Sequence, residues 1–278
     1  MLYVCATPIG NMKDISLRAL ELLNLADIIL CEDTRTSHKL LSFHGIKPKK
    51  LVAFHQHNEN EIANKVLTWL ADDLLIIQIS DAGTPGISDP GARLCKILFD
   101  NGYEPSPLPG ACAYISLLSV SGILSKEHLF IGFLSSKSSH RIKELHQYID
   151  SEYPVILYES PHRIIDCIKD IISVHGTTKE LLIGRELTKM FETIKRANAA
   201  DILNFILSDT NQQKGEFVLI LLPRQKEVNL FNSLTEQQVK TIDLLSKELP
   251  PKKASQIASQ ILELNKQDIY DYILSTKK

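Results

Sequence analysis

Cysteine is scarce in this chain, and the few cysteines are scattered. They are Cys5, Cys31, Cys95, Cys112 and Cys167, and no two of them form a C-x-x-C pair. This spacing excludes a disulfide framework and the usual zinc motifs, and the odd number suits a reducing compartment. The chain also lacks a basic stretch followed by an apolar run at its start, and any segment near the roughly 18 apolar residues of a membrane span. We therefore expect a cytoplasmic protein with no membrane partner.

Aromatic residues and excess charge are also scarce. Aromatic side chains make up 6% of the 278 residues, so Leu, Ile, Val and Ala must fill the core. The formal net charge is -2, so no global positive field draws the protein onto nucleic acid and any RNA contact must be local. The 44% hydrophobic content excludes wholesale disorder. At about 150 residues per domain, the length predicts about two domains.

Short apolar runs alternate with stretches of helical period over the first hundred residues. The expected strands are 2–6, 27–31, 51–54 and 74–79, and the expected helices are 17–25, 37–43, 59–70 and 91–99. The run 74–79 is almost purely apolar, which is typical of a strand covered on both faces. The alternation predicts an α/β fold with a mostly parallel sheet between two layers of helices.

A second α/β series follows Pro109 and Gly110. Its expected strands are 129–134, 155–158, 181–183 and 217–222, and its expected helices are 111–120, 142–149, 163–174 and 199–207. These strands are farther apart and some connections lack a helix, which favours a partly antiparallel, mixed sheet. The rest predicts two or three helices, over 236–248, 253–264 and 268–274. We expect α/β domains at 1–112 and 113–225, and a small helical module at 226–278.

Glycine and proline gather at the carboxyl ends of the expected strands, where open parallel sheets bind ligands. Three such loops are Thr7–Asn11, Ser80–Gly91 and Leu108–Ala113. Alone, the first is most simply a plain βα turn. The second, S-D-A-G-T-P-G-I-S-D-P-G, is too rich in special residues for that, and we expect Asp89 to cap a helix whose first residue is Pro90. No loop is a G-x-G-x-x-G or Walker motif, so the pattern predicts a cofactor held by backbone and apolar contacts.

Two adjacent carboxylates and an arginine end the second expected strand, in C-E-D-T-R. Glu32, Asp33 and Arg35 could orient a substrate hydroxyl and a phosphate. Equally, Asp33 or Thr34 could cap the next helix while Glu32 and Arg35 are solvated. The residues alone leave both interpretations open.

Further polar clusters lie at later strand ends. His55 and His57 have an H-x-H spacing, but no third ligand is identifiable, so we interpret them as a polar loop and expect no metal. The sets Y-E-S-P-H-R (158–163), R-E-L-T-K (185–189) and K-G-E (214–216) each lie at a strand boundary. Their joint placement favours a site between the two domains.

Several of these motifs occur in an order that resembles one family. They are T-P-I-G-N with D-I-S, C-E-D-T-R, H-N-E (57–59), the long Ser80–Gly91 loop, P-G-A-C-A (109–113), Y-E-S-P-H-R and R-E-L-T-K. The chain resembles the small-subunit ribosomal RNA methyltransferase I family within the tetrapyrrole methylase superfamily, over essentially its whole length. It departs from the usual pattern at Ser135, where a proline is common.

The resemblance implies a fold, a cofactor and a reaction. It implies two α/β domains with S-adenosylmethionine between them, a homodimer, and methylation of a cytidine ribose 2′-oxygen in 16S rRNA of the small ribosomal subunit. Cofactor contacts would fall on Ile9, Thr84, Ile87, Cys112, Ala113, Tyr158, Leu187 and Phe217. Gly10 and Gly83 would let the main chain approach the adenosine.

A ribose hydroxyl is a poor nucleophile at neutral pH, so a carboxylate would help as general base. The candidates are Asp33, Glu32 and Asp81, in that order. For RNA phosphates, the cations nearest the candidate loops are Arg35, Lys137, Arg141, Arg163 and Lys189. Two other functions stay open: a methyltransferase acting on a tetrapyrrole-like small molecule, and a non-catalytic ribosome assembly factor. The dimer face and any RNA contact of the helical module are not indicated.

Overall fold

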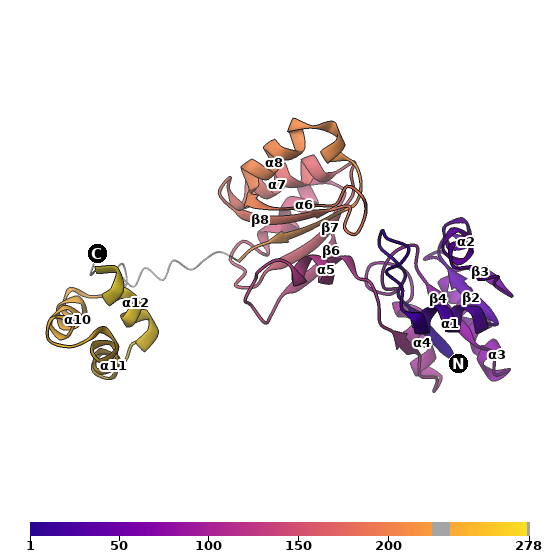
Figure 1. The fold of residues 1–278 in the computed structure, drawn as a ribbon, viewed down its shortest axis with the longest axis horizontal. Coiled ribbons are helices and arrows are strands. Elements are labelled where there is room, and N and C mark those ends of the chain that lie inside the picture. Colours follow the sequence, from indigo (N-terminus) through magenta and orange to yellow (C-terminus); the bar gives the residue numbers. More distant parts are fainter. Residues whose placement is uncertain (224–233, 277–278) are drawn as a thin grey trace. The chain divides into compact units, whose positions relative to one another are not determined.

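The structure is a computed structural model that describes residues 1–223 and 234–276. The chain divides into two compact units, Met1–Pro223 and Arg224–Lys278. The first unit holds two five-stranded sheets with their helices, and the described part of the second, residues 234–276, holds three helices (Figure 1). The three-part division expected from the sequence stays a prediction, and its boundary at 225/226 lies outside the described residues.

The first sheet is wholly parallel, with the order β3-β2-β4-β1-β5. Its strands are β1 (Leu2–Cys5), β2 (Ile28–Cys31), β3 (Leu51–Ala53), β4 (Ile76–Ile79) and β5 (Ser106–Leu108). Its helices are α1 (Leu17–Leu25), α2 (Thr34–Phe43), α3 (Glu59–Ala71) and α4 (Ala92–Asp100). One apolar cluster joins α3 and α4 to one face of the sheet, and another joins α1 and α2 to the other face. The prediction of a parallel sheet between helices is confirmed.

The second sheet is mixed, with the order β6-β7-β10-β8-β9. Its strands are β6 (Leu129–Phe133), β7 (Val155–Glu159), β8 (Glu180–Arg185), β9 (Thr193–Asn198) and β10 (Phe217–Leu221), and only β6 and β7 pair in parallel. Its helices are α5 (Ala113–Ser119), α6 (Ser138–His146), α7 (Ile164–His175) and α8 (Ala199–Ser208), followed by the short 3₁₀ helix η1 (Thr210–Gln213). Figure 1 shows α6, α7 and α8 on one face and α5 on the other. The expected mixed sheet is thus confirmed.

Two of the strands, β5 and β9, were not predicted from the sequence, because neither has a strong apolar pattern. β5 is only three residues long and contains Pro107, so it has little pattern to detect. β9 pairs with β8 alone and is therefore an edge strand. Its sequence, T-I-K-R-A-N, is mostly polar, as is common at a sheet edge, and so lacks the apolar pattern that predicts a strand.

The helical unit consists of α10 (Glu236–Glu248), α11 (Pro251–Leu262) and α12 (Lys266–Thr276). A capping box of Thr235 and Gln238 begins α10, and Pro251 is the first residue of α11, where a missing N–H carries no penalty. Ile242, Ala258 and Ile269 bury their side chains in the small core between the three helices. In the part of the chain that is described, no helix has the length and apolar character needed to cross a membrane.

Candidate functional site

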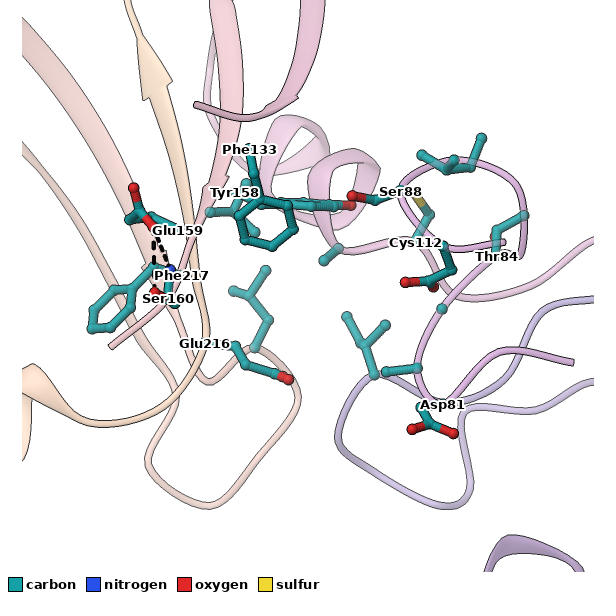
Figure 2. Close-up of a pocket in the computed structure, with 18 of the residues that line it drawn as sticks. Asp81, Thr84, Ser88, Cys112, Phe133, Tyr158, Glu159, Ser160, Glu216 and Phe217 are labelled. Atoms are coloured by element: carbon teal, nitrogen blue, oxygen red, sulfur yellow. Dashed lines mark hydrogen bonds between the residues drawn. The ribbon is translucent and has the colours of Figure 1, made fainter. Parts of the chain in front are cut away.

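A cavity of about 460 Å³ lies within the first unit, between loops of the first sheet and one end of the second sheet. Figure 2 shows Thr84 and Cys112 on one side of it, and Phe133 and Phe217 on the other. Nine of the ten residues expected to contact a cofactor line this cavity: Ile9, Gly83, Thr84, Ile87, Cys112, Ala113, Tyr158, Leu187 and Phe217. The fold therefore brings together residues from distant motifs.

Hydrogen bonds tie the three glycine-rich loops to one another. The N–H of Thr7 donates to the carbonyl of Gly83 at 2.8 Å, and the N–H of Gly83 donates back at 3.0 Å. The Thr84 hydroxyl donates to the carbonyl of Ala111 at 3.0 Å. Gly83 has φ +83°, a conformation that glycine adopts without a steric penalty. The cavity is thus bounded on this side by a rigid, backbone-rich wall.

Gly10 is the one expected cofactor residue that does not line the cavity. A Cβ built on it would lie 2.7 Å from the carbonyl oxygen of Leu187 and 2.5 Å from Cγ of Lys189. The N–H of the next residue, Asn11, donates to Oγ1 of Thr188 at 3.1 Å. Gly10 therefore allows the first loop to pack against the R-E-L-T-K turn, which in turn carries Leu187 into the cavity.

The helix expected to start at Pro90 starts two residues later, and Asp89 does not cap it. The N-cap is Gly91, with φ +138°, and α4 begins at Ala92. The buried carboxylate of Glu59 takes over the capping role, since its Oε1 accepts the N–H of Gly91 at 3.2 Å and that of Leu94 at 3.3 Å. Asp89 is thereby left free to line the cavity.

Carboxylates dominate the polar lining of the cavity. They are Glu32, Asp81, Asp89, Glu159 and Glu216, and none of the lining residues that the structure describes is Lys, Arg or His. Burial, reinforced by the neighbouring charge of Asp81, raises the pKa of Asp89 to about 6. Burial also raises the pKa of Glu32, with Asp89 adding to the effect, and burial raises the pKa of Asp81. This environment favours a cationic ligand over a phosphate.

Asp33, the first candidate for general base, is the N-cap of α2 and does not line the cavity. Its Oδ1 accepts the N–H of Arg35 at 2.8 Å, and its Oδ2 lies 2.6 Å from the Arg35 guanidinium. These contacts lower the pKa of Asp33 to about 2. The capping interpretation of C-E-D-T-R is confirmed for Asp33, whereas Glu32 and Asp81 do line the cavity.

Two of the five cations expected to contact RNA serve the protein's interior instead. The Arg141 side chain is 3% exposed, its Nε donates to Oδ2 of Asp170 at 2.7 Å, and a second nitrogen donates to the carbonyl of Ser135. Arg163 donates to the carbonyl of Leu134 at 2.6 Å. The Arg141 guanidinium is buried and fully engaged by Asp170 and two backbone carbonyls, so it presents no free N–H group to a phosphate.

Of the other three expected cations, Arg35 and Lys137 are exposed, whereas the Lys189 side chain, at 30%, is about as accessible as that of Arg163, at 27%. Lys189 pairs with Glu186 at 2.7 Å and with Glu216, a cavity residue, at 3.0 Å. Arg35 pairs with Asp33 but its side chain is 87% exposed, and Lys137 is exposed at the N-cap of α6. None of these three lines the cavity among the residues that the structure describes.

Two cavity residues that matter to the site were missed by the sequence analysis, Phe133 and, as a lining group, Asp89, whereas Glu159 and Glu216 belong to the sets expected at the site but were given no role there. The Glu159 side chain is 0% exposed, and its Oε2 accepts a hydrogen bond from Arg163 at 3.2 Å. The i,i+4 spacing of this pair in Y-E-S-P-H-R was the available signal. Phe133 gave no such signal, since a single aromatic at a strand end is ordinary.

His55 and His57 lie with ring centroids 5.9 Å apart. Across residues 1–223 and 234–276, no group of three or more His, Cys, Asp or Glu side chains is arranged to hold a metal ion.

Comparisons with known proteins fit this geometry. The profile of the family "Tetrapyrrole (Corrin/Porphyrin) Methylases" matches residues 1–203, and that of the "RsmI C-terminal HTH domain" matches 233–277. Proteins named "Ribosomal RNA small subunit methyltransferase I" are 40% identical in Neisseria meningitidis, covering 99% of this chain and 94% of the relative, and 42% identical in Haemophilus influenzae, covering 99% and 96%. The chain belongs to the small-subunit ribosomal RNA methyltransferase I family of tetrapyrrole methylases. It is therefore a methyltransferase.

Solved tetrapyrrole methylases share the fold of this methyltransferase at low sequence identity. The cobalt precorrin-4 methyltransferase CbiF superposes with a TM-score of 0.57 at 17% identity, covering 79% of this chain and 93% of that protein. The methyltransferase CobJ superposes with a TM-score of 0.59 at 16% identity, covering 80% and 94%. At these identities the likeness concerns the fold alone.

Proposed function

We propose that this methyltransferase transfers a methyl group from S-adenosylmethionine to the ribose 2′-oxygen of a cytidine in 16S rRNA of the small ribosomal subunit. The single observation that carries the proposal is the acidic, glycine-walled cavity in a chain that is about 40% identical, over nearly its full length, to proteins named for small-subunit rRNA methylation.

The residues around the cavity fit S-adenosylmethionine. This cofactor carries a sulfonium, an ammonium and a carboxylate but no phosphate, and the described lining supplies five carboxylates and no cationic side chain. Ile9, Leu187 and Phe217 are buried and form an apolar wall suited to a purine ring. The residues that would hold the cofactor are Ile9, Gly83, Thr84, Ile87, Cys112, Ala113, Tyr158, Leu187 and Phe217. When bound, the cofactor supplies a methyl group made electrophilic by the positive sulfur.

The chain's own contribution is to position the hydroxyl and to accept its proton. We propose Asp89 as the general base, ahead of Asp81 and Glu32, because it lines the cavity and its pKa of about 6 lies near neutrality. Asp33, first in the sequence-based order, is a poor base because its carboxylate binds Arg35 and the α2 N-terminus. Asp89 would accept the hydroxyl proton as the oxygen–methyl bond forms and the methyl–sulfur bond breaks, which leaves a neutral thioether.

A local set of contacts would serve the RNA. Lys137 and Arg35 are the exposed members of the expected cation set, and Lys189 lies beside the cavity residue Glu216. With a net charge of -2, a shaped ribonucleoprotein surface is a better substrate than naked RNA. We further propose a cytoplasmic homodimer, and sedimentation velocity at micromolar concentration would test the dimer.

The two alternatives receive less support. The structural neighbours that act on tetrapyrrole precursors are under 20% identical and share the fold alone. The rRNA-named relatives match at about 40% and include the helical unit. A non-catalytic assembly factor would not need a carboxylate such as Asp89 held at a raised pKa inside its cavity.

The deciding experiment uses small subunits purified from cells that lack this modification. The full chain is incubated with them and S-adenosylmethionine carrying a labelled methyl group, and nuclease digestion with mass mapping locates the label. We expect one 2′-O-methylcytidine in 16S rRNA, and faster transfer to assembled subunits than to free rRNA. Cofactor binding without transfer to any ribosomal fraction would refute the proposal.

A further inference from the structure

Phe133 is presented to the cavity by an irregularity in β6. The pairing register of β6 with β7 shifts between Phe130 and Gly132, which marks a β-bulge. Gly132 has φ +67°, a left-handed conformation that a side chain would strain. Bulges often occur next to active sites, where they change the direction in which a side chain points. Here the bulge immediately precedes Phe133, the last residue of the strand and a cavity residue.

Phe133 is also the outer end of a chain of five aromatic rings, which ends at His128 beside Tyr114. Its ring packs edge-on against Tyr158, with centroids 5.7 Å apart, and Figure 2 shows the two together beside the cavity. Tyr158 contacts Phe130 at 5.0 Å, and Phe130 stacks on Tyr114 at 4.4 Å. The Tyr158 hydroxyl oxygen accepts the N–H of Tyr114 at 3.3 Å, which fixes that ring. The Phe133 ring is therefore fixed by its packing against Tyr158, which is itself fixed by Phe130 and by the N–H of Tyr114.

Phe133 is the most exposed of the large apolar side chains in the described lining, and Ile87, at 45%, is the next. Ile9, Leu187 and Phe217 are buried, whereas Phe133 is 54% exposed. The buried residues suit a small cofactor that enters the cavity completely. A polynucleotide is too large to enter and can reach only the exposed rim. Proteins bind unstacked RNA bases by stacking them on aromatic rings. Phe133, a half-exposed aromatic at the rim whose position is fixed by the rings behind it, has the properties that such stacking requires.

We infer that Phe133 is the stacking platform for the nucleobase of the acceptor nucleotide, an inference that rests on the proposed rRNA methylation. The base packs on the open face of the Phe133 ring, so that its own ribose lies over the cavity that holds the methyl donor and Asp89. The ligand class is a single unstacked nucleobase. Stacking tolerates any base, so Phe133 sets the position of the acceptor, and other contacts choose the cytidine.

The test compares Phe133→Leu and Phe133→Tyr with wild type and with the matched control Phe191→Leu. Leu keeps apolar packing against Tyr158 but removes the aromatic face, whereas Tyr keeps the face. Phe191 is 70% exposed and does not line the cavity, so its loss reports on any exposed phenylalanine. For each protein we measure KM and kcat on unmodified small subunits, the Kd for S-adenosylmethionine by calorimetry, and the melting temperature.

We expect Phe133→Leu to raise KM for small subunits about tenfold, with cofactor Kd and melting temperature unchanged. Phe133→Tyr should stay within about twofold of wild type, as should Phe191→Leu. An unaltered KM in Phe133→Leu, an equal loss in Phe191→Leu, or a weakened cofactor Kd, which would place the ring against the cofactor, would each overturn the inference. If wild type itself transfers no methyl group to rRNA, the proposed function fails and the inference fails with it.

Discussion

The side chain of Gln78 occupies the space that a Cβ on Gly91 would need. A Cβ built on Gly91 would overlap Nε2 of Gln78 and lie 3.0 Å from its Cδ. The same Nε2 donates to the carbonyl of Pro90 at 2.9 Å. Because Gln78 is buried in β4 at the centre of the first sheet, this contact fastens the end of the Ser80–Gly91 loop to the core.

Substituting Gly91 by Ala should therefore displace the loop that carries Asp89. Alanine at φ +138° is strained, and its Cβ must push Gln78 aside. Together we expect a loss of about 3 kcal/mol in the free energy of unfolding, measured by urea denaturation, and a large drop in methyl transfer. Gly102→Ala is the matched control, since Gly102 has φ +78° with nothing within 4 Å, and it should lose only about 1 kcal/mol. Equal losses at the two positions would show that the Gln78 side chain moves aside at no energetic cost, contrary to the prediction.

We expect Glu59 to stabilise the fold mainly because its Oε1 accepts hydrogen bonds, and less because the side chain is charged. Glu59→Ala leaves the N–H groups of Gly91 and Leu94 without their acceptor, so we expect a loss of about 2 kcal/mol, or roughly 6 °C in melting temperature. Glu59→Gln keeps an oxygen at the same position and should lose under about 1 kcal/mol. Scanning calorimetry of the three proteins checks this order. A Gln variant as unstable as the Ala variant would contradict the capping role.

Asp89 should set the pH dependence of methyl transfer. A general base must be ionised, so the single-turnover rate on small subunits should rise with pH, with its midpoint near the Asp89 pKa of about 6, and level off above pH 7. Burial raises this pKa most, and the negative charges of Asp81 and Glu216, which also line the cavity, add to the effect. Asp89→Asn should lower the plateau rate by roughly 10²–10⁴-fold and leave cofactor binding intact. A variant with wild-type rates would exclude Asp89 as the base.

The same substitution should make the protein more stable at neutral pH. The pKa of Asp89 is higher in the folded state, about 6 against an ordinary 3.8, so the folded state binds the proton more tightly than the unfolded state does. Ionisation above pH 6 therefore works against folding. Asn removes that charge, and we expect a gain of about 1 kcal/mol at pH 7.5, after allowing for solvent screening, that fades toward pH 4. A fall in melting temperature at pH 7.5 would indicate a structural role for Asp89.

The helices and strands could be predicted wherever the sequence has a strong pattern of apolar residues. The apolar run at 74–79 gave the central strand β4, and the alternation of strands and helices gave the parallel sheet. The pattern was too weak for β5, which is three residues long, and for β9, whose polar residues suit a sheet edge. Periodicity reports burial, so it says little about strands that are short or exposed.

The sequence predicted which loops come together at the candidate site, but it did not predict the role of each charged residue there. Glycine-rich turns at strand ends predicted where the loops meet, and the family resemblance supplied most of the nine expected residues that line the cavity. The partners of charged side chains were less visible. Asp33 binds Arg35 two residues away, Glu59 caps a helix 32 residues on, and Arg141 pairs with Asp170 on the next helix. These pairings decide which charges remain free for chemistry, and for the pairs made by Glu59 and Arg141, which join residues 32 and 29 positions apart, only the fold reveals them.

Arg141 should contribute to stability and not to RNA affinity. Arg141→Met leaves Asp170, whose side chain is 13% exposed, without its cation, so we expect a loss of about 3–5 kcal/mol in the free energy of unfolding. At a temperature where the variant is folded, the slope of log KM for small subunits against log salt should equal that of wild type. Lys137→Ala, exposed at the N-cap of the same helix, should keep its stability and reduce that slope by about one if it contacts a phosphate. A reduced slope in Arg141→Met, with Lys137→Ala unchanged, would restore Arg141 as the RNA contact and would require α6 to rearrange on binding.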